Sequence, residues 1–251
     1  MDLSERHDSR GARHPWETAR LLAVEKLVRQ LGLRDPRVLD VGCGDGYVIS
    51  ELQRRLGLGQ VVAQDAHFTD EHLREFARPG ATFARELGDI PFRADLVLLL
   101  DVLEHLEDPG ALLRELIEKR VVAGGHFLIT VPAFPALFTQ HDVLLRHFRR
   151  YTRRDLEREV RDAGLELMGS GHLFASLLAP RALSALKERL RPPSGPLPAA
   201  PEGVGKWQSS PLATRLIHGA LVFDNELCTR ARSFGIDIPG LSVWATCRTR
   251  S

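Results

Sequence analysis

The stretch Val38-Leu39-Asp40-Val41-Gly42-Cys43-Gly44-Asp45-Gly46 decides the fold of this 251-residue chain. Its first half is a short apolar run that predicts a buried strand, and YVISELQRRLG after it predicts a helix. A strand that stops at glycines and reopens as a helix brings backbone N–H groups close to a ligand, because side chains there would block the approach. The stretch therefore predicts a ligand site at the carboxyl end of a strand.

An acidic residue follows about twenty positions later, at the end of the next predicted strand, VVAQDA. This residue, Asp65, can accept hydrogen bonds from both hydroxyls of a ribose, so the two features together predict a nucleoside site. The glycines form GxGxG, whereas the dinucleotide fingerprint is GxGxxG and Tyr47 stands at its last glycine. The pattern speaks against NAD, and an NAD-dependent oxidoreductase remains the rival interpretation.

Strands and helices alternate through the first 132 residues, which predicts a parallel sheet with helices on both faces. ADLVLLLD is a continuous apolar run, as expected of a strand buried on both sides. The other predicted elements are a helix over 16–31, a helix near 70–77, a weaker strand at ATFAREL, the helix PGALLRELIEKR and the strand HFLITVP. After Pro132 the pattern predicts a helix at RRDLEREVRDAG and strands at LELMGSGHLF and LSVWATCRT. One large α/β domain accounts for the whole pattern.

The composition excludes several classes of protein. A formal net charge of +1 gives no broad phosphate-binding face, so no nucleic-acid partner is expected. The three cysteines form no CxxC pair, which argues against a disulfide framework and favours a reducing cytoplasm. Residues 1–14 are polar and predict a flexible tail rather than a signal peptide, and no apolar run approaches the ~20 residues that span a bilayer.

Four motifs, in order, resemble those of class I S-adenosylmethionine-dependent methyltransferases. VLDVGCGDG resembles motif I, AQDA the following acidic motif, and GGHFLITVP the fifth-strand motif. DLVLLLDVLEHLEDP is similar to the fourth-strand motif of the subgroup that includes ubiquinone-biosynthesis and small-molecule methyltransferases. The resemblance covers about 16–165. It implies a Rossmann-like seven-stranded sheet whose last strand runs antiparallel, within a domain at 15–251 that carries a substrate-lid insertion at 175–239.

The resemblance implies S-adenosylmethionine as the cofactor and assigns its contacts residue by residue. The loop would hold the methionine end, Asp65 the ribose, and an acid before Pro91-Phe92 the adenine amino group, with Asp89 as the alternative acid. The residues so implied are Arg20 for the methionine carboxylate, Asp40, Gly42, Cys43, Gly44 and Gly46 of the loop, Asp65, Ala66 beside the adenine, Glu86 with Leu87, and Asp101 and Val102 facing the sulfonium.

Methyl transfer to a hydroxyl needs a base for the departing proton. His105, in Glu104-His105, is one candidate, because the fourth-strand motif lies near the methyl group. The pattern HDxxxxHxRRY resembles a bacterial methyltransferase subgroup and offers His141 or His147, oriented by Asp142. The alternative is a hydrogen-bonded loop anchor, in which Arg150 and Asp142 form a structural ion pair. No metal is expected, because the sequence lacks the acidic cluster that a metal site would use.

Five arginines within nine residues suggest a second property of the acceptor. They are Arg146, Arg149, Arg150, Arg153 and Arg154. Guanidinium forks could grip an anionic acceptor, with Arg150 and Tyr151 as substrate residues. The alternative is a solvated helix face balanced by nearby acids.

The insertion at 175–239 is expected to cap the carboxyl edge of the sheet. Its first helix is apolar on one stripe and basic around it. Such a stripe is expected to pack on its own domain, with contact to a membrane surface as the alternative. RPPSGPLPAAPEGVG predicts a flexible connector, and the polar residues at 224–226 could enter the pocket.

The sequence thus predicts a methyltransferase acting on a small or medium-sized molecule, with O-methylation of a glycan-like or natural-product acceptor. A catalytically silent module that binds the cofactor as a partner protein is the second rival. The sequence carries no signal of oligomeric state.

Overall fold

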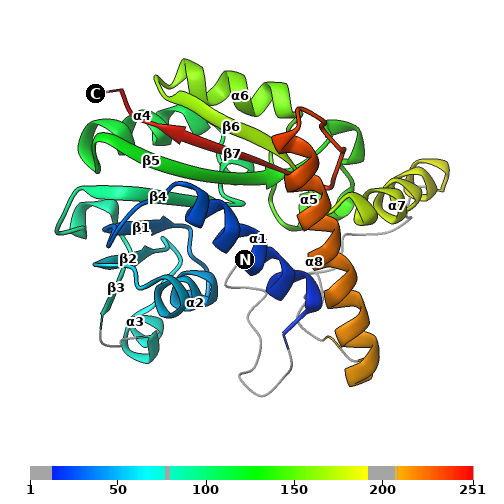
Figure 1. Ribbon diagram of the computed structural model, residues 1–251, viewed down its shortest axis with the longest axis horizontal. Coiled ribbons are helices and arrows are strands. Elements are labelled where there is room, and N and C mark those ends of the chain that lie inside the picture. The colour runs from blue at the N-terminus through cyan, green and yellow to red at the C-terminus, as the bar shows by residue number, and fades with distance from the viewer. Residues whose placement is uncertain (1–12, 77–79, 192–206, 208, 251) are drawn as a thin grey trace.

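The computed structural model describes residues 13–76, 80–191, 207 and 209–250, and its centre is one seven-stranded sheet (Figure 1). The strand order is β3-β2-β1-β4-β5-β7-β6. All pairings are parallel except those of β7 with β5 and β6, which are antiparallel. The strands are β1 Val38–Val41, β2 Val61–Gln64, β3 Ala81–Ala84, β4 Ala94–Leu100, β5 Val121–Pro132, β6 Glu166–Leu173 and β7 Ser242–Arg248. The predicted sheet and its antiparallel last strand are confirmed.

Helices cover both faces of the sheet, as the alternation predicts. α4 and α6 pack in one hydrophobic core, whereas α1, α2 and α8 contribute to the other. The helices are α1 Pro15–Gln30, α2 Tyr47–Leu56, α3 Asp70–Phe76, α4 Pro109–Lys119, α5 Gln140–Leu144, α6 Arg153–Asp162, α7 Leu178–Leu190 and α8 Pro211–Ser233.

The central strand β4 shows why the sheet is buried on both sides. Leu96 and Leu98 enter the core beneath α1 and α2, while Val97 and Leu99 enter the core beneath α4 and α6. Because successive side chains of a strand point to opposite faces, both faces must be apolar. The carboxyl ends of β1, β2, β4 and β5 therefore meet at one rigid edge, where the functional side chains lie.

Arg13 and His14, the last two residues of the predicted tail that the structure describes, make specific contacts. The Arg13 guanidinium lies 2.5 Å from the Asp45 carboxylate and 3.7 Å from the centre of the Tyr47 ring. His14 Nδ1 accepts a hydrogen bond from the Trp16 N–H and so caps α1. The rest of that prediction, residues 1–12, lies outside the described residues.

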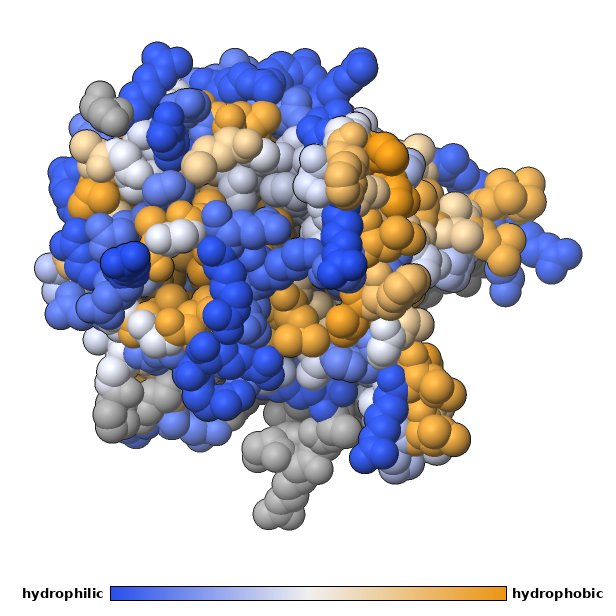
Figure 2. All heavy atoms as spheres, in the orientation of Figure 1, coloured by the Kyte–Doolittle hydropathy of each residue, from blue (hydrophilic) through white to orange (hydrophobic). Residues whose placement is uncertain are grey.

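The segment 175–239 lies between β6 and β7 and contributes α7 and α8. Most of the predicted connector lies outside the described residues. The expected packing of the apolar stripe is confirmed for its first part, where Phe174 is buried and Leu177 packs against the core. It is wrong for α7, where Leu183, Leu186 and Leu190 are exposed. Figure 2 shows apolar side chains at the surface over α8 and α7. Helical periodicity identifies an apolar face but not what covers it.

Candidate active site

The glycine loop between β1 and α2 adopts a conformation that requires glycine. Gly42, Gly44 and Gly46 all have positive φ, between +58° and +69°. A Cβ at Gly42 would lie 2.7 Å from Cγ2 of Val102, which is too close for two carbon atoms. The loop therefore brings bare backbone against the end of β4, as the sequence predicts.

Beside this loop lies a cavity of about 330 Å³, here called the loop cavity. Asp65 is buried at its wall: its Oδ2 accepts a hydrogen bond from the Gly44 N–H at 3.0 Å, and its Oδ1 accepts one from the His67 N–H at 2.9 Å. Among the predicted cofactor residues, those that line the loop cavity are Gly42, Asp65, Ala66, Leu87, Asp101 and Val102. The backbone of the loop and of the turn after β2 thus fixes the Asp65 carboxylate at the wall of the loop cavity.

The predicted adenine acid is not part of this wall. Glu86 is exposed, and so is the alternative Asp89, at the ends of the short 3₁₀ helix η2 Leu87–Asp89. Leu87 lines the loop cavity instead, because the turn directs the apolar side chain inward. The structure brings an apolar contact to this wall and leaves both acids outside it.

Asp40 and Cys43 lie beneath the loop rather than in the cavity wall. Asp40 is buried, and its Oδ1 has no hydrogen-bond partner within the described part of the chain. Burial raises the pKa of Asp40 to about 7, against the opposing charge of Arg20. Cys43 is buried as well; its N–H donates to the Gln64 carbonyl at 3.0 Å, and burial raises the pKa of its thiol. Neither residue lines the loop cavity.

A second cavity of about 400 Å³, here called the histidine cavity, adjoins the first. Asp101 and His105 line both cavities, so the two meet at the end of β4. Asp101 has a φ of +59°; its Oδ1 accepts from the Thr130 hydroxyl at 3.0 Å, and its Oδ2 lies 2.8 Å from Arg20 Nη2. Arg20 also lies against the Trp16 ring, 5.3 Å from its centre. The predicted Arg20 is thus at the junction, held by an ion pair.

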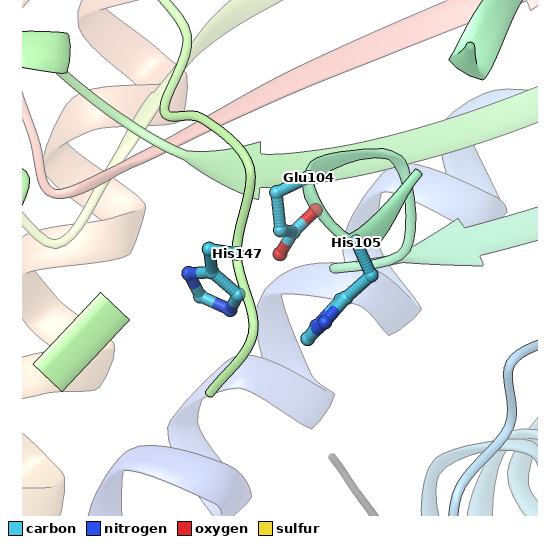
Figure 3. A group of neighbouring side chains, drawn as sticks. All are labelled: Glu104, His105 and His147. Atoms are coloured by element: carbon cyan, nitrogen blue, oxygen red, sulfur yellow. The ribbon is translucent and has the colours of Figure 1, made fainter. Parts of the chain in front are cut away.

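Three side chains converge in the histidine cavity (Figure 3): Glu104 and His105 from the 3₁₀ helix η3 Leu103–His105, and His147 from the segment after α5. One ligand atom of each lies within 4.8 Å of the others, and the two imidazole rings meet edge-on with centres 4.5 Å apart. Burial and the charge of Asp101 raise the pKa of Glu104 well above its usual value. The expectation of no metal rests on the missing acidic cluster, yet the fold assembles three side chains that could hold a divalent ion.

Asp142 is the fully buried anchor of the histidine cavity. Its Oδ1 lies 3.2 Å from His147 Nδ1 and accepts from Arg150 Nε at 2.7 Å, and its Oδ2 accepts from Arg181 Nη2 at 2.7 Å. Burial opposes ionisation, but the hydrogen bond from His147 and the charge of Arg150 hold the pKa of Asp142 well below its usual value. The carboxylate therefore fixes the ring of His147 and leaves Nε2 for another partner.

Of the remaining residues predicted to contact the acceptor, two line the histidine cavity and one does not. His141 and Arg150 line the histidine cavity, but Arg150 is paired with Asp142, as in the structural alternative. Tyr151 does not line this cavity: it is buried in the hydrophobic core, and its hydroxyl lies 3.4 Å from the Leu103 carbonyl. Tyr151 bridges to Ala133 in extended backbone, where adjacent side chains point to opposite sides.

The five arginines do not converge in the histidine cavity. Arg149 donates to the Leu106 and Glu107 carbonyls, and Arg153 pairs with Glu157 and Asp237. Of the five, Arg150 lines the histidine cavity. The alternative, in which these arginines are solvated or paired with nearby groups of the protein, describes the cluster better than binding of an anionic acceptor.

Several wall residues of the histidine cavity were not predicted. They are His14, Trp16, Pro132, Leu145, Leu177, Leu241 and Ser242. The polar residues at 224–226 instead tie the fold together, since Asp224 accepts from Ser176 and Asn225 accepts from the Phe174 N–H. The local signal for His14 and Trp16 is the sequence HPW, which caps and begins α1, the helix that carries Arg20.

The sheet order and the two joined cavities define a class I S-adenosylmethionine-dependent methyltransferase fold. Residues 15–169 match the family described as a methyltransferase domain, and the chain belongs to that family. The family uses S-adenosylmethionine as its cofactor, and the glycine loop and Asp65 of the loop cavity fit that molecule.

Relatives and solved structures agree with this assignment. The ubiquinone biosynthesis O-methyltransferase of Xanthomonas euvesicatoria is 30% identical over 189 residues, which cover 66% of this chain and 78% of that protein. The protein of the same description from Azorhizobium caulinodans is 32% identical over 157 residues, and the match spans 54% of this chain and 60% of that protein's length.

Two solved structures share the fold at low identity. The S-adenosylmethionine-dependent methyltransferase from Mesorhizobium loti is 14% identical, with a TM-score of 0.51 and coverage of 90% of this chain and 97% of that one. The [4+2]-cyclase SpnF is 15% identical, with a TM-score of 0.54 and coverage of 98% and 85%. A shared fold therefore does not by itself define the reaction.

Proposed function

We propose that this protein transfers the methyl group of S-adenosylmethionine to a hydroxyl oxygen of a small or medium-sized acceptor, with His147 as the general base. The observation that carries the proposal is the contact between Asp142 Oδ1 and His147 Nδ1, at 3.2 Å, in the wall of a cavity that joins the loop cavity. A carboxylate on one imidazole nitrogen orients the ring and stabilises the imidazolium that forms when the other nitrogen takes a proton.

When bound, S-adenosylmethionine supplies a methyl group on a positively charged sulfur, which leaves as a thioether when an oxygen takes the methyl. The residues of this chain bind and orient the cofactor and the acceptor, and they remove a proton from the acceptor hydroxyl. Asp65 would hold the ribose hydroxyls, and Arg20, which pairs with Asp101, would meet the methionine carboxylate. Alignment of two reactants in this way can contribute ~7–11 kcal/mol. His147 Nε2 accepts the hydroxyl proton, and Asp142 remains ionised throughout.

The lining of the histidine cavity supports an acceptor without strong negative charge. The two guanidinium groups in its wall, those of Arg20 and Arg150, are each paired with a carboxylate. Trp16, Leu145 and Leu177 supply apolar surface. This supports a natural-product acceptor with an ionisable hydroxyl more than an anionic one; a glycan-like acceptor remains compatible with the imidazoles as hydrogen-bonding groups.

Calorimetric titration with S-adenosylmethionine, S-adenosylhomocysteine and NAD tests the cofactor. Asp65→Ala is expected to weaken binding of the two adenosyl ligands about 10- to 100-fold, because a hydrogen bond to a charged group contributes ~1.5–3 kcal/mol. The matched control is Asp70→Ala, which removes an exposed carboxylate paired with Arg85. Binding of NAD alone would overturn the assignment.

A hydroxylated acceptor panel, read by mass spectrometry, then tests the reaction. Transfer that requires His147 supports the proposal. Tight cofactor binding with no transfer to any acceptor of the panel would favour the silent partner protein instead.

A further inference from the structure

The two helices between β6 and β7 each expose large apolar side chains, and these are here called the α7–α8 surface. Leu190 is 74% exposed, Phe223 70% and Leu216 66%. The surface comprises Leu183, Leu186 and Leu190 of α7 and Leu212, Leu216, Ile217, Phe223 and Leu227 of α8. Figure 2 shows apolar side chains at the surface over α8 and α7. Apolar side chains that gather in this way mark a surface for binding.

The opposite faces of both helices are tied to the domain, so the apolar faces are held outward. α8 packs on α1, where Lys26 Nζ lies 2.5 Å from the Glu226 carboxylate, and Leu221 and Cys228 are buried. α7 is held by Arg181, which donates to the carboxylate of Asp142. The exposure is therefore built into the fold.

The charges around the α7–α8 surface are of one sign. Lys187, Arg191 and Arg215 are exposed, and none forms an ion pair within the described residues. The carboxylates of the two helices have other partners or are buried. Glu188 accepts a hydrogen bond from the Gln140 N–H, and Asp224 is buried. Glu226 forms ion pairs with Lys26 and Arg230. The surface is thus apolar and cationic, with no exposed acid free to offset it among those residues.

We propose that the α7–α8 surface docks on a bilayer interface that carries anionic headgroups. Leucine and phenylalanine side chains enter the boundary of the acyl chains, while lysine and arginine side chains meet the headgroups. A second copy of this chain fits less well, because a two-fold contact along α8 would oppose Arg215 of each copy to the cations of the other. No helix in the described parts of the chain is long and apolar enough to cross a membrane, so the contact is peripheral.

Docking would also place the histidine cavity beside the interface. Leu177, which immediately precedes α7, lines that cavity. An amphiphilic acceptor could then enter from the bilayer. This consequence rests on the proposed methyl transfer, whereas docking itself does not.

Cosedimentation of the full chain with vesicles tests the proposal without any turnover. The vesicles contain phosphatidylcholine alone or with one-third phosphatidylglycerol. We expect binding to the anionic vesicles, at least tenfold weaker binding to the neutral ones, and loss of affinity as salt rises. The double variant Leu216→Glu, Phe223→Glu should weaken binding at least tenfold, and Arg215→Glu should weaken it less.

The matched control is Met168→Glu, which changes an apolar side chain, 48% exposed, on β6 outside the α7–α8 surface. It should bind as the unaltered chain does, and all variants should keep its melting temperature, because the altered side chains are exposed. Equal binding to both vesicle types, or no binding, would overturn the proposal. A concentration-dependent dimer in sedimentation velocity, broken by the double variant, with no vesicle binding would assign the surface to a second copy.

Discussion

Arg181 of α7 and Asp142 of α5 form an ion pair, with Nη2 2.7 Å from Oδ2, although 39 positions separate them in the chain. The same carboxylate contacts Nδ1 of His147 through its other oxygen. Arg181 also donates to the Thr139 hydroxyl at 2.6 Å. One buried carboxylate thus connects α7 to the proposed base.

Arg181→Met should lower both stability and turnover. We expect the free energy of unfolding in urea to fall by about 1.5–3 kcal/mol, because a buried carboxylate loses a charged hydrogen-bond donor. We expect kcat to fall about tenfold, because the ring of His147 loses part of its support, and Arg181→Lys should restore part of both. Arg189→Met, which removes an exposed arginine bonded to a backbone carbonyl, is the control and should cost less than ~0.5 kcal/mol. Equal losses in the two methionine variants would contradict this.

Asp142→Asn should destabilise the protein in a pH-dependent way. The pKa of Asp142 is lowered in the folded state, so its contribution is complete above the unfolded pKa of ~3.9 and is lost as pH falls through the folded value. We expect a loss of ~3–5 kcal/mol at pH 7, because the cations around it lose their partner. The difference from the unaltered chain should shrink as the pH falls below about 4, measured by urea unfolding at each pH. Asp162→Asn, at an exposed position of α6, should change stability little at any pH, and a constant difference for Asp142→Asn would argue against the buried carboxylate.

His147→Gln should remove the base but leave the cofactor site intact. We expect kcat for a hydroxyl acceptor to fall ~10²–10⁴-fold and to recover partly at high pH, where the acceptor ionises without help. Affinity for S-adenosylhomocysteine should be unchanged in calorimetry. His141→Gln is the matched control: burial lowers the pKa of His141, but no carboxylate holds its ring in the described structure, and we expect less than a tenfold effect. A larger loss in His141→Gln would assign the base to that residue.

Gly42→Ala, compared with Gly57→Ala, should separate the cost of a clash with Val102 from the cost of placing alanine in left-handed backbone. Gly42 and Gly57 have similar φ values, +67° and +61°, but a Cβ would meet Val102 only at Gly42. Both alanine variants should carry the ~1–2 kcal/mol cost of the left-handed backbone, and Gly42→Ala should lose a further ~1–3 kcal/mol and most cofactor affinity. Val102→Ala in the Gly42→Ala background should recover part of the loss. Identical unfolding and binding in the two single variants would show that the loop does not need the close approach.

The features that could be predicted from sequence are local ones. The glycine loop, the strand before it and the helix after it lie within twenty residues, and their conformation depends on backbone sterics that glycine alone satisfies. Asp65 could be predicted because the end of the next parallel strand must lie at the same edge of the sheet. The α/β fold, the glycine loop and Asp65 follow from such rules, whereas Ala66, Leu87, Asp101 and Val102 of the loop cavity were implied by the family resemblance.

The direction of single side chains in irregular segments could not be predicted. Tyr151 was expected beside Arg150 at the acceptor, but in extended backbone the two point to opposite sides, one to the core and one to the cavity. Glu86 was expected at the adenine, but the 3₁₀ turn after it places Leu87 inward. In both cases a shift of one residue changes which side chain reaches the site, and sequence spacing does not resolve such a shift.

By itself, the sequence determined the order of strands and helices, the glycine loop and the acid of the nucleoside site, because these depend on periodicity and backbone sterics over short distances. The tertiary structure alone decided that His147 rather than His141 is held by Asp142, that Glu104 joins two histidines, and that the apolar stripes of α7 and α8 face outward. These outcomes depend on which distant elements pack against each other. Packing is a property of the whole chain, and no local pattern encodes it.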